Sequence, residues 1–260
     1  MKSRIVLALL LVALATGCGS APPPAAVTVA PVEVWPAGVQ EVTTVPPTAP
    51  ADCDVEASLR PGPLPAPGAM PAGSTMAAIA QRGRLIVGVD QNTNLFGFRN
   101  PSTGQLEGFD IDVAREIARA IFGDPDRIDP RVVEAGQRES ALQSGEVDMV
   151  VRTFSITCER RKNVAFSSVY YFANQKILAA VGSGIDSAEK LGGKRVCAVS
   201  GTTSLKRLLA LNPRPTVISA TSWTDCLVML QQGQIDAIST DDSVLAGLAQ
   251  QDRLNVAVGW

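Results

Sequence analysis

The chain has 260 residues, of which 46% are hydrophobic and 18% charged, and its formal net charge at pH 7 is −2. A nearly neutral chain without a basic cluster is not typical of a nucleic-acid-binding protein. The chain also contains no histidine, which is the commonest general base and the commonest zinc ligand. The composition therefore argues against nucleic-acid binding, Ser-His-Asp hydrolysis and most zinc chemistry.

The first residues are typical of an export signal. Lys2 and Arg4 precede an apolar run over residues 5–15, and Gly17 and Cys18 follow. An apolar core of this length is short for a membrane span and usual for a signal peptide. Cys18 after small residues is similar to the lipobox of bacterial lipoproteins, and the alternative is an ordinary signal followed by a chance cysteine. We expect residues 1–17 to be removed and a lipid on Cys18 to hold the chain at the extracytoplasmic face of the cell membrane.

A long segment of low complexity follows the signal. Residues 18–75 are rich in Pro, Ala, Val and Thr, a composition that favours an extended, semi-rigid chain over a packed core. From Met76 the composition becomes globular and stays so, which leaves roughly 185 residues for one large or two small domains. We therefore predict a tether that carries a folded part away from a membrane.

Strands and helices alternate through the folded part, in two successive runs. The first run comprises a strand at 84–90, a helix at 108–123, a strand at 131–133, a helix at 138–144 and a strand at 147–151. The second comprises strands at 194–199, 216–219, 235–239 and 255–258, with helices at 204–211, 222–232 and 243–251. This order predicts two α/β lobes with mainly parallel sheets. Ligands of such sheets bind at the carboxyl ends of the strands.

Polar side chains gather where the strand at 147–151 ends. Residues 152–161 read RTFSITCERR, with three Ser or Thr hydroxyls and three arginines. Such groups are costly to bury without partners, so they face either water or a polar or anionic ligand.

Six motifs in order carry a resemblance to a known family: RLIVGVD, GFDIDVAREIA, ALQSGEVDMVV, SITCERRKNVAFSSVYY, GGKRVCAVSGTTS and GQIDAISTDDSVLAG. Through these six motifs, the chain from about Gly83 resembles the bacterial solute-binding proteins, family 3, that deliver polar amino acids to ABC importers. Within that family it looks most like actinobacterial glutamate/glutamine-binding lipoproteins. The resemblance implies the two-lobe fold of type II periplasmic binding proteins, with lobe one at 76–169, a hinge at 170–175 and lobe two at 176–260. It also implies hinged closure on one amino acid, with no chemistry and no cofactor.

The resemblance assigns the groups that would hold an amino-acid zwitterion. Arg160 would bind the α-carboxylate, because a guanidinium matches a carboxylate bidentately. The remaining contacts would come from Ser155, the backbone around Thr153, the Thr202 side chain, the Thr203 backbone and, for the ammonium group, Asp241. Alternatives stay open: Arg160 could pair with Glu159 or with a surface carboxylate, Thr202 could be an N-cap, and Asp241 or, more fittingly, Asp242 could cap the next helix.

Two further arginines bear on the ligand's side chain. Arg138 lies where relatives that bind acidic amino acids place an arginine for the distal carboxylate, and Arg152 adds a second positive charge. These charges favour glutamate or aspartate over glutamine or asparagine. Asp90 would cancel that argument if it paired with Arg138 or Arg152. Many relatives stack an aromatic ring on the ligand where this chain has Thr93 and Ala135; Phe96 or Phe154 could replace that ring.

Four cysteines follow Cys18, and an even set in an exported protein suggests disulfides with three possible pairings. On the frame of the resemblance we expect Cys197–Cys226 within lobe two and Cys53–Cys158 between the tether and lobe one. The alternative is buried free thiols. None of these cysteines has the close spacing of a metal site, and we expect no metal.

The family's chain returns from lobe two to lobe one, whereas this sequence ends at Trp260. We therefore expect a truncated chain that lacks one hinge segment and exposes apolar surface on lobe one. Three rival functions remain for such a chain. A dehydratase would need a site acid, for which Asp90 is the one candidate; a sensor would present the liganded protein to a membrane signalling partner; a structural lipoprotein would not need the carboxylate clamps.

Overall fold

The computed structural model describes residues 34–44, 52–252 and 255–258, the last four by their backbone alone. The signal peptide, Cys18 and much of the tether lie outside these ranges, so the expectations for them stay predictions. Within the described ranges no helix has the length and apolar character needed to cross a membrane.

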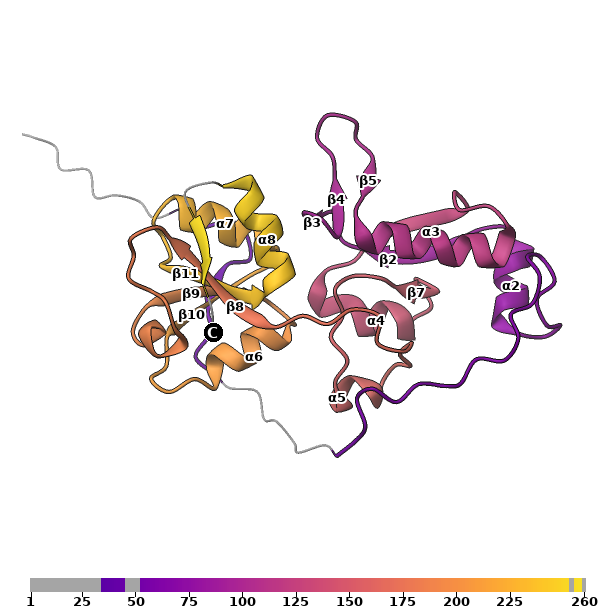
Figure 1. The fold of residues 1–260 in the computed structure, drawn as a ribbon, viewed down its shortest axis with the longest axis horizontal. Helices are drawn as coiled ribbons and strands as arrows, with labels where there is room; N and C mark the ends of the chain where they lie inside the picture. Colours follow the sequence, from indigo (N-terminus) through magenta and orange to yellow (C-terminus); the bar gives the residue numbers. More distant parts are fainter. Residues whose placement is uncertain (1–33, 45–51, 253–254, 259–260) are drawn as a thin grey trace, which may run out of the picture. The chain divides into compact units, whose positions relative to one another are not determined.

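Lobe one is built on a three-stranded parallel sheet with the order β6-β2-β7. The central strand β2 is an apolar run, LIVGV, and its residues are mostly buried. Helix α3 packs on β2 through Ile111, Ala114 and Ala118, which recur at helical spacing (Figure 1). The main elements of this lobe are α2 (Thr75–Arg82), β2 (Leu85–Val89), α3 (Phe109–Phe122), β6 (Ile128–Val132), α4 (Arg138–Gln143), β7 (Met149–Val150) and α5 (Cys158–Arg161).

A small antiparallel sheet extends from lobe one between β2 and α3. It consists of β3 (Asn92–Thr93), β4 (Gly97–Arg99) and β5 (Leu106–Glu107). The sequence analysis missed this sheet, because strands of two or three residues are too short to show an alternating pattern. It matters for the site because its first strand begins two residues after Asp90 and contains Thr93, whose hydroxyl donates to the Asp90 carboxylate.

Lobe two contains a six-stranded sheet with the order β1-β10-β9-β11-β8-β12. Its inner strands β10, β9 and β11 are parallel, as predicted, whereas β1, β8 and β12 pair antiparallel with their neighbours. Helices α6, α7 and α8 surround the sheet (Figure 1). The elements are β1 (Gln40–Glu41), β8 (Gln175–Ala180), β9 (Arg195–Val199), α6 (Thr203–Leu209), β10 (Thr216–Ala220), α7 (Trp223–Gln231), β11 (Ala237–Asp241), α8 (Asp242–Gln251) and β12 (Asn255–Val258).

Part of the predicted tether is bound to lobe two. Strand β1 pairs antiparallel with β10, and the Val42 N–H donates to the Val217 carbonyl at 2.8 Å. Trp35, Val39 and Val42 pack against the core of the lobe. The low-complexity composition did not indicate this strand, which gains its hydrogen bonds from the edge of β10 rather than from a core of its own.

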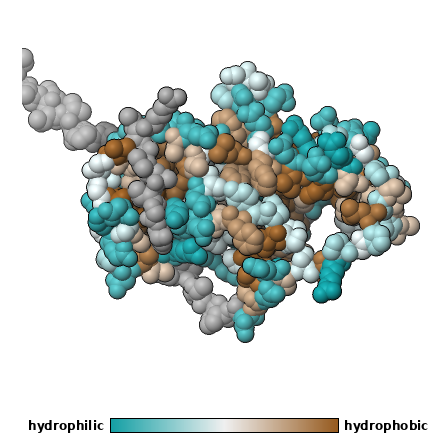
Figure 2. All heavy atoms as spheres, in the orientation of Figure 1, coloured by the Kyte–Doolittle hydropathy of each residue, from teal (hydrophilic) through white to brown (hydrophobic). Residues whose placement is uncertain are grey.

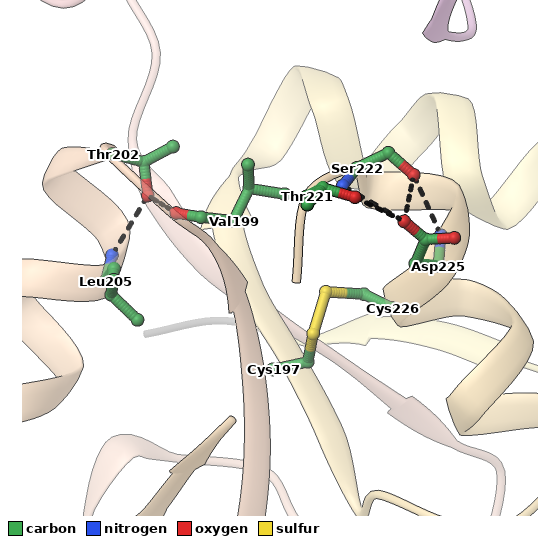
Figure 3. The surroundings of a disulfide bond; sticks show 8 residues. All are labelled: Cys197, Val199, Thr202, Leu205, Thr221, Ser222, Asp225 and Cys226. Carbon is green, nitrogen blue, oxygen red and sulfur yellow. Dashed lines mark hydrogen bonds between the residues drawn. A yellow bond between two sulfur atoms is a disulfide. The ribbon is translucent and has the colours of Figure 1, made fainter. Parts of the chain in front are cut away.

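Both predicted disulfides are present. Cys53 is bonded to Cys158, with 5.7 Å between the Cα atoms, and fastens the N-terminal segment to α5 of lobe one. Cys197 in β9 is bonded to Cys226 in α7, inside the core of lobe two (Figure 3). A crosslink restricts the unfolded chain more when it closes a longer loop, so the first bond, across 105 residues, constrains the unfolded state more.

Candidate functional site

The predicted binding residues meet at one small polar cavity. Its volume is about 10 Å³. It is lined by Arg138, Arg152, Thr153, Ser155, Thr202, Thr203, Ser204, Trp223, Thr240, Asp241 and Val244. Seven of the nine predicted ligand-binding residues are among them, and they come from both lobes. The other two do not line the cavity but contact residues that do: Asp90 pairs with Arg152, and Arg160 donates to the Ser155 carbonyl.

Arg160 is held by carbonyl groups of both lobes. Its guanidinium donates to the Ser155 carbonyl at 2.7 Å and to the Gly201 carbonyl at 2.9 Å. The alternative partner, Glu159, pairs instead with Lys206 of lobe two. The nearest acid to Arg160 is Glu139, with 3.8 Å between Nε and Oε1. Arg160 is therefore buried, its donors bind backbone carbonyl groups, and its ion pair with Glu139 is weak.

Arg138 is buried and donates to backbone acceptors through all three of its nitrogen atoms. It donates to four carbonyl oxygens, those of Ala135 at 2.8 Å, of Arg152 and Thr153 at 3.2 Å, and of Gly201 at 3.1 Å. Burial and the neighbouring arginines lower the pKa of its guanidinium, which nevertheless stays charged in the ordinary pH range. No acid of the described chain pairs with it directly.

Arg152 forms a buried ion pair with Asp90, in which Nη2 and Oδ2 are 3.1 Å apart and both side chains are 5% exposed or less. Asp90 also accepts hydrogen bonds from the backbone N–H groups of Gln91 and Asn92 and from the Thr93 hydroxyl. Asp90 therefore pairs with Arg152 and cancels its charge, as the alternative from the sequence allowed. Thr93, at the position where relatives carry an aromatic ring, helps to hold the carboxylate.

The predicted aromatic replacements lie outside the small cavity. The Phe154 ring packs between two guanidinium groups, 4.2 Å from that of Arg138 and 4.6 Å from that of Arg160. Phe96 belongs to an aromatic cluster with Phe109 and Tyr171. Phe154 therefore makes cation–π contacts with two of the arginines predicted to hold an amino acid, whereas neither Phe154 nor Phe96 lines the small cavity.

The two lobes touch at a turn that needs glycine. Gly201 has φ +73°, and a Cβ atom there would lie 2.5 Å from the Cα atom of Gly136 in lobe one. Nearby, the Ser155 and Thr203 hydroxyl oxygens are 3.4 Å apart. The cavity has room for about one water molecule. The lobes must separate here before an amino acid can enter.

Two predicted residues of lobe two have local roles. The Thr202 hydroxyl accepts from the Leu205 N–H at 3.1 Å and donates to the Val199 carbonyl at 2.6 Å, so Thr202 is the N-cap of α6 (Figure 3). Asp242 is the first residue of α8 and accepts from the Ser243 N–H at 2.8 Å, so the N-cap position belongs to Asp241 and not, as the alternative expected, to Asp242. Asp241 makes no side-chain cap hydrogen bond. Burial and the charge of Asp242 raise the pKa of Asp241.

The sequence analysis missed one acid of the site, Asp110. It is 2% exposed, and its Oδ2 accepts from the Thr153 N–H at 3.0 Å. Burial is the main cause that raises the pKa of Asp110 to about 6, while the Thr153 hydrogen bond opposes the shift. Helical spacing could have found it, because Asp110 precedes Ala114 and Ala118 by four and eight residues on the buried face of α3.

A larger cavity of about 620 Å³ adjoins the small one, and the two share Thr153, Ser155, Asp241 and Val244. Its walls are largely apolar and come from α3, β7 and residues 164–173. In Figure 2 the outer face of α3 is hydrophilic, while hydrophobic residues gather below it over α4 and β7. A ligand in the widened site would therefore meet the zwitterion-binding groups on one side and apolar walls on the other.

No group of three or more acidic, cysteine or histidine side chains within the described ranges could hold a metal ion.

The fold and the site define a two-lobed binding protein. Among solved structures, the chain is similar to the cysteine-binding protein of Campylobacter jejuni, with a TM-score of 0.67, 27% identity, and coverage of 70% of this chain and 73% of that one. It is also similar to arginine-bound ArgBP of T. maritima (a Gly52Ala mutant), with a TM-score of 0.65, 28% identity, and coverage of 70% and 84%.

The chain belongs to the bacterial extracellular solute-binding proteins, family 3, whose pattern matches residues 85–210. It is 41% identical to the ABC transporter glutamine-binding protein GlnH of Bacillus subtilis, over 69% of this chain and 66% of that protein. Identity to the glutamine-binding protein of Geobacillus stearothermophilus is 40%, over 69% of each. Identity to the glutamate-binding protein GluB of Corynebacterium glutamicum is 31%, over 69% and 62%. The chain thus spans about two thirds of the length of these relatives, which are named as binding proteins and not as enzymes.

Proposed function

We propose that this chain is a lipid-anchored extracytoplasmic binding protein that captures glutamine, or a closely similar amino acid, between its lobes and delivers it to an ABC importer. The observation that carries the proposal is the meeting of seven predicted binding residues, from both lobes, around one polar cavity. The glutamine- and glutamate-binding relatives support the same class of ligand. Lipid attachment at Cys18 rests on the sequence alone.

The hydrogen bonds around Gly201 suggest how a ligand would enter. The carbonyl oxygen of Gly201 accepts from both Arg138 and Arg160. When the lobes separate, Gly201 withdraws and frees two cationic donors, which a ligand carboxylate would then occupy. Asp241 lines the opposite part of the cavity and would receive the ammonium group. In this proposal the amino acid replaces a contact between the lobes.

The charge balance of the site favours an amide side chain over a second carboxylate. Asp90 neutralises Arg152, and backbone carbonyls occupy the donors of Arg138. A glutamate side chain would need one of these arginines to give up its partners, and separating a buried ion pair is costly. A glutamine side chain brings no charge and needs only neutral hydrogen-bond partners. The sequence-based preference for acidic amino acids is therefore replaced here by a proposed preference for glutamine.

Calorimetric titration of the protein with glutamine, glutamate, asparagine and aspartate tests both parts of the proposal. We expect glutamine to bind about ten-fold or more tightly than glutamate, because glutamate would leave an uncompensated buried charge. Tighter binding of glutamate would overturn the proposed preference for an uncharged side chain. Binding of none of the four amino acids at millimolar concentration would overturn the proposed function.

The Asp90→Asn variant provides a matched control for selectivity. Asparagine keeps an acceptor for the backbone N–H groups of Gln91 and Asn92 but no longer neutralises Arg152. The ratio of glutamate to glutamine affinity should rise in this variant. An unchanged ratio would mean that Arg152 does not face the ligand's side chain.

A further inference from the structure

We propose that Asp110 is a positioning residue for amino-acid binding: its carboxylate holds the backbone N–H of Thr153 and thereby fixes the loop 152–155 in its binding conformation. The inference rests on the proposed function, since this loop supplies Thr153 and Ser155 to the site. Asp110 itself lies in the first turn of α3, in a different element from every residue predicted to bind the ligand.

The loop needs an external support at Thr153. The φ angle of this residue is +38°, in a region that residues with a side chain seldom adopt. Such a conformation persists only where neighbouring groups hold it. The Thr153 N–H donates to Oδ2 of Asp110 at 3.0 Å, and its carbonyl accepts from Nη1 of Arg138 at 3.2 Å. The N–H and the carbonyl group of Thr153 are therefore both held by charged side chains.

The support at Asp110 reaches the binding groups through the backbone. Arg152 precedes Thr153 and is fixed by Asp90, while Phe154 follows it and packs between two guanidinium groups. The next residue, Ser155, faces the cavity and gives its carbonyl to Arg160. A weaker hydrogen bond from Thr153 to Asp110 would let the peptide rotate, and Ser155 and its contact with Arg160 would move with it.

The charge of Asp110 depends on pH near neutrality. Four titratable or charged groups face it from other elements: Asp90 after β2, Arg138 in α4, Arg152 after β7 and Tyr170 in the hinge. Burial and Asp90 raise the pKa of Asp110, the two arginines lower it, and the result is about 6. Asp110 is therefore ionised above about pH 6 and becomes neutral below. An ionised acceptor makes the stronger hydrogen bond.

The sign of the pH effect on binding is opposite to that on folding. The folded-state pKa of Asp110 lies above its ordinary value of 3.8, so the folded protein takes up this proton more readily than the unfolded chain does. As the pH falls through about 6, protonation of Asp110 therefore raises the free energy of unfolding. Binding should weaken over the same range, because the loop loses its ionised support. If Asp110 had a purely structural role, the pH profile of binding would not run opposite to the pH profile of the free energy of unfolding.

The first test is calorimetric titration with L-glutamine between pH 5 and pH 7.5. Neither charged group of glutamine titrates in this range, and the chain contains no histidine. The affinity of the wild-type protein should fall about ten-fold with a midpoint near pH 6. Asp110→Asn should bind like the wild type at pH 5 and show little change with pH. Asp112→Asn, exposed on the same helix, should follow the wild type. A wild-type profile in Asp110→Asn would overturn the proposal.

The second test needs no ligand. In the ¹⁵N–¹H spectrum of the wild-type protein, the Thr153 amide signal should shift with a midpoint near pH 6, and in Asp110→Asn it should not. If no amino acid binds the wild-type protein, the proposed function fails while this measurement still decides the role of Asp110. A Thr153 amide that does not respond to pH would overturn the inference, and this holds even if the Asp110→Asn variant does not fold.

Discussion

The variant Arg160→Ala is expected to lose binding of every amino acid by about a hundred-fold or more, because truncating one partner of a buried charge pair costs about 2–5 kcal/mol. Like Arg138, Arg160 donates to carbonyl groups of both lobes, at Ser155 and Gly201. All amino acids carry the α-carboxylate that it would bind, so the loss should not depend on the ligand's side chain. Calorimetric titration with glutamine and asparagine measures it.

Two control variants separate the guanidinium from its charge. Arg160→Lys keeps the positive charge but not the planar fork, so it should recover only part of the affinity. Lys162→Ala removes an exposed charge two residues away and should bind normally. Thermal unfolding establishes that each variant is folded. Near-normal binding by a folded Arg160→Ala protein would exclude this residue as the carboxylate clamp.

The variant Gly201→Ala is expected to separate the lobes in the absence of ligand. Its Cβ atom would lie 2.5 Å from the backbone of Gly136, a distance that requires one of the two turns to move. The positive φ angle adds about 1 kcal/mol of backbone strain for a residue with a side chain. Since strands and helices support both turns, the less costly response is a movement of one lobe away from the other. Small-angle X-ray scattering should show a larger radius of gyration than that of the wild-type protein.

Gly233→Ala isolates the steric contact from the strain. Gly233 has φ +70°, but no atom lies within 4 Å of the position that a Cβ would take. Both variants should therefore lose a similar amount of stability to strain, about 1 kcal/mol. Only Gly201→Ala should change the scattering profile. Equal radii of gyration for the two variants would mean that the contact between Gly201 and Gly136 does not hold the lobes together.

The long periodic segments of the fold were predictable from the sequence. The apolar run of β2 and the helical spacing of α3 describe elements that are largely buried, and burial imposes such patterns. Strand β8 has an equally apolar stretch, QKILAA, yet the sequence analysis did not identify it. It was missed because it lies between the hinge and the first strand of the second run, outside the regular alternation of strands and helices.

The sequence predicted which residues gather around the cavity but not how they pair. Resemblance identified Arg138, Arg152 and Asp90 as members of the site, and the structure brings them together. Which acid neutralises which arginine depends on contacts between residues that lie 62 positions apart in the sequence, as Asp90 and Arg152 do. Local patterns carry no such information. Asp110 was missed although its helix was predicted, because the pattern of that helix was traced through its apolar residues alone.

The position of β1 has a consequence for the sheet that it joins. An outer strand without a partner presents a row of unpaired N–H and carbonyl groups, which is a template for pairing with another chain. In lobe two, Gln40 and Glu41 occupy that row on β10 and place two polar residues along the outside. A chain shortened to begin at α2 would leave β10 open. The segment that carries β1 therefore replaces the five-residue edge of β10 by an edge of two exposed polar residues, a shorter template for pairing with another chain.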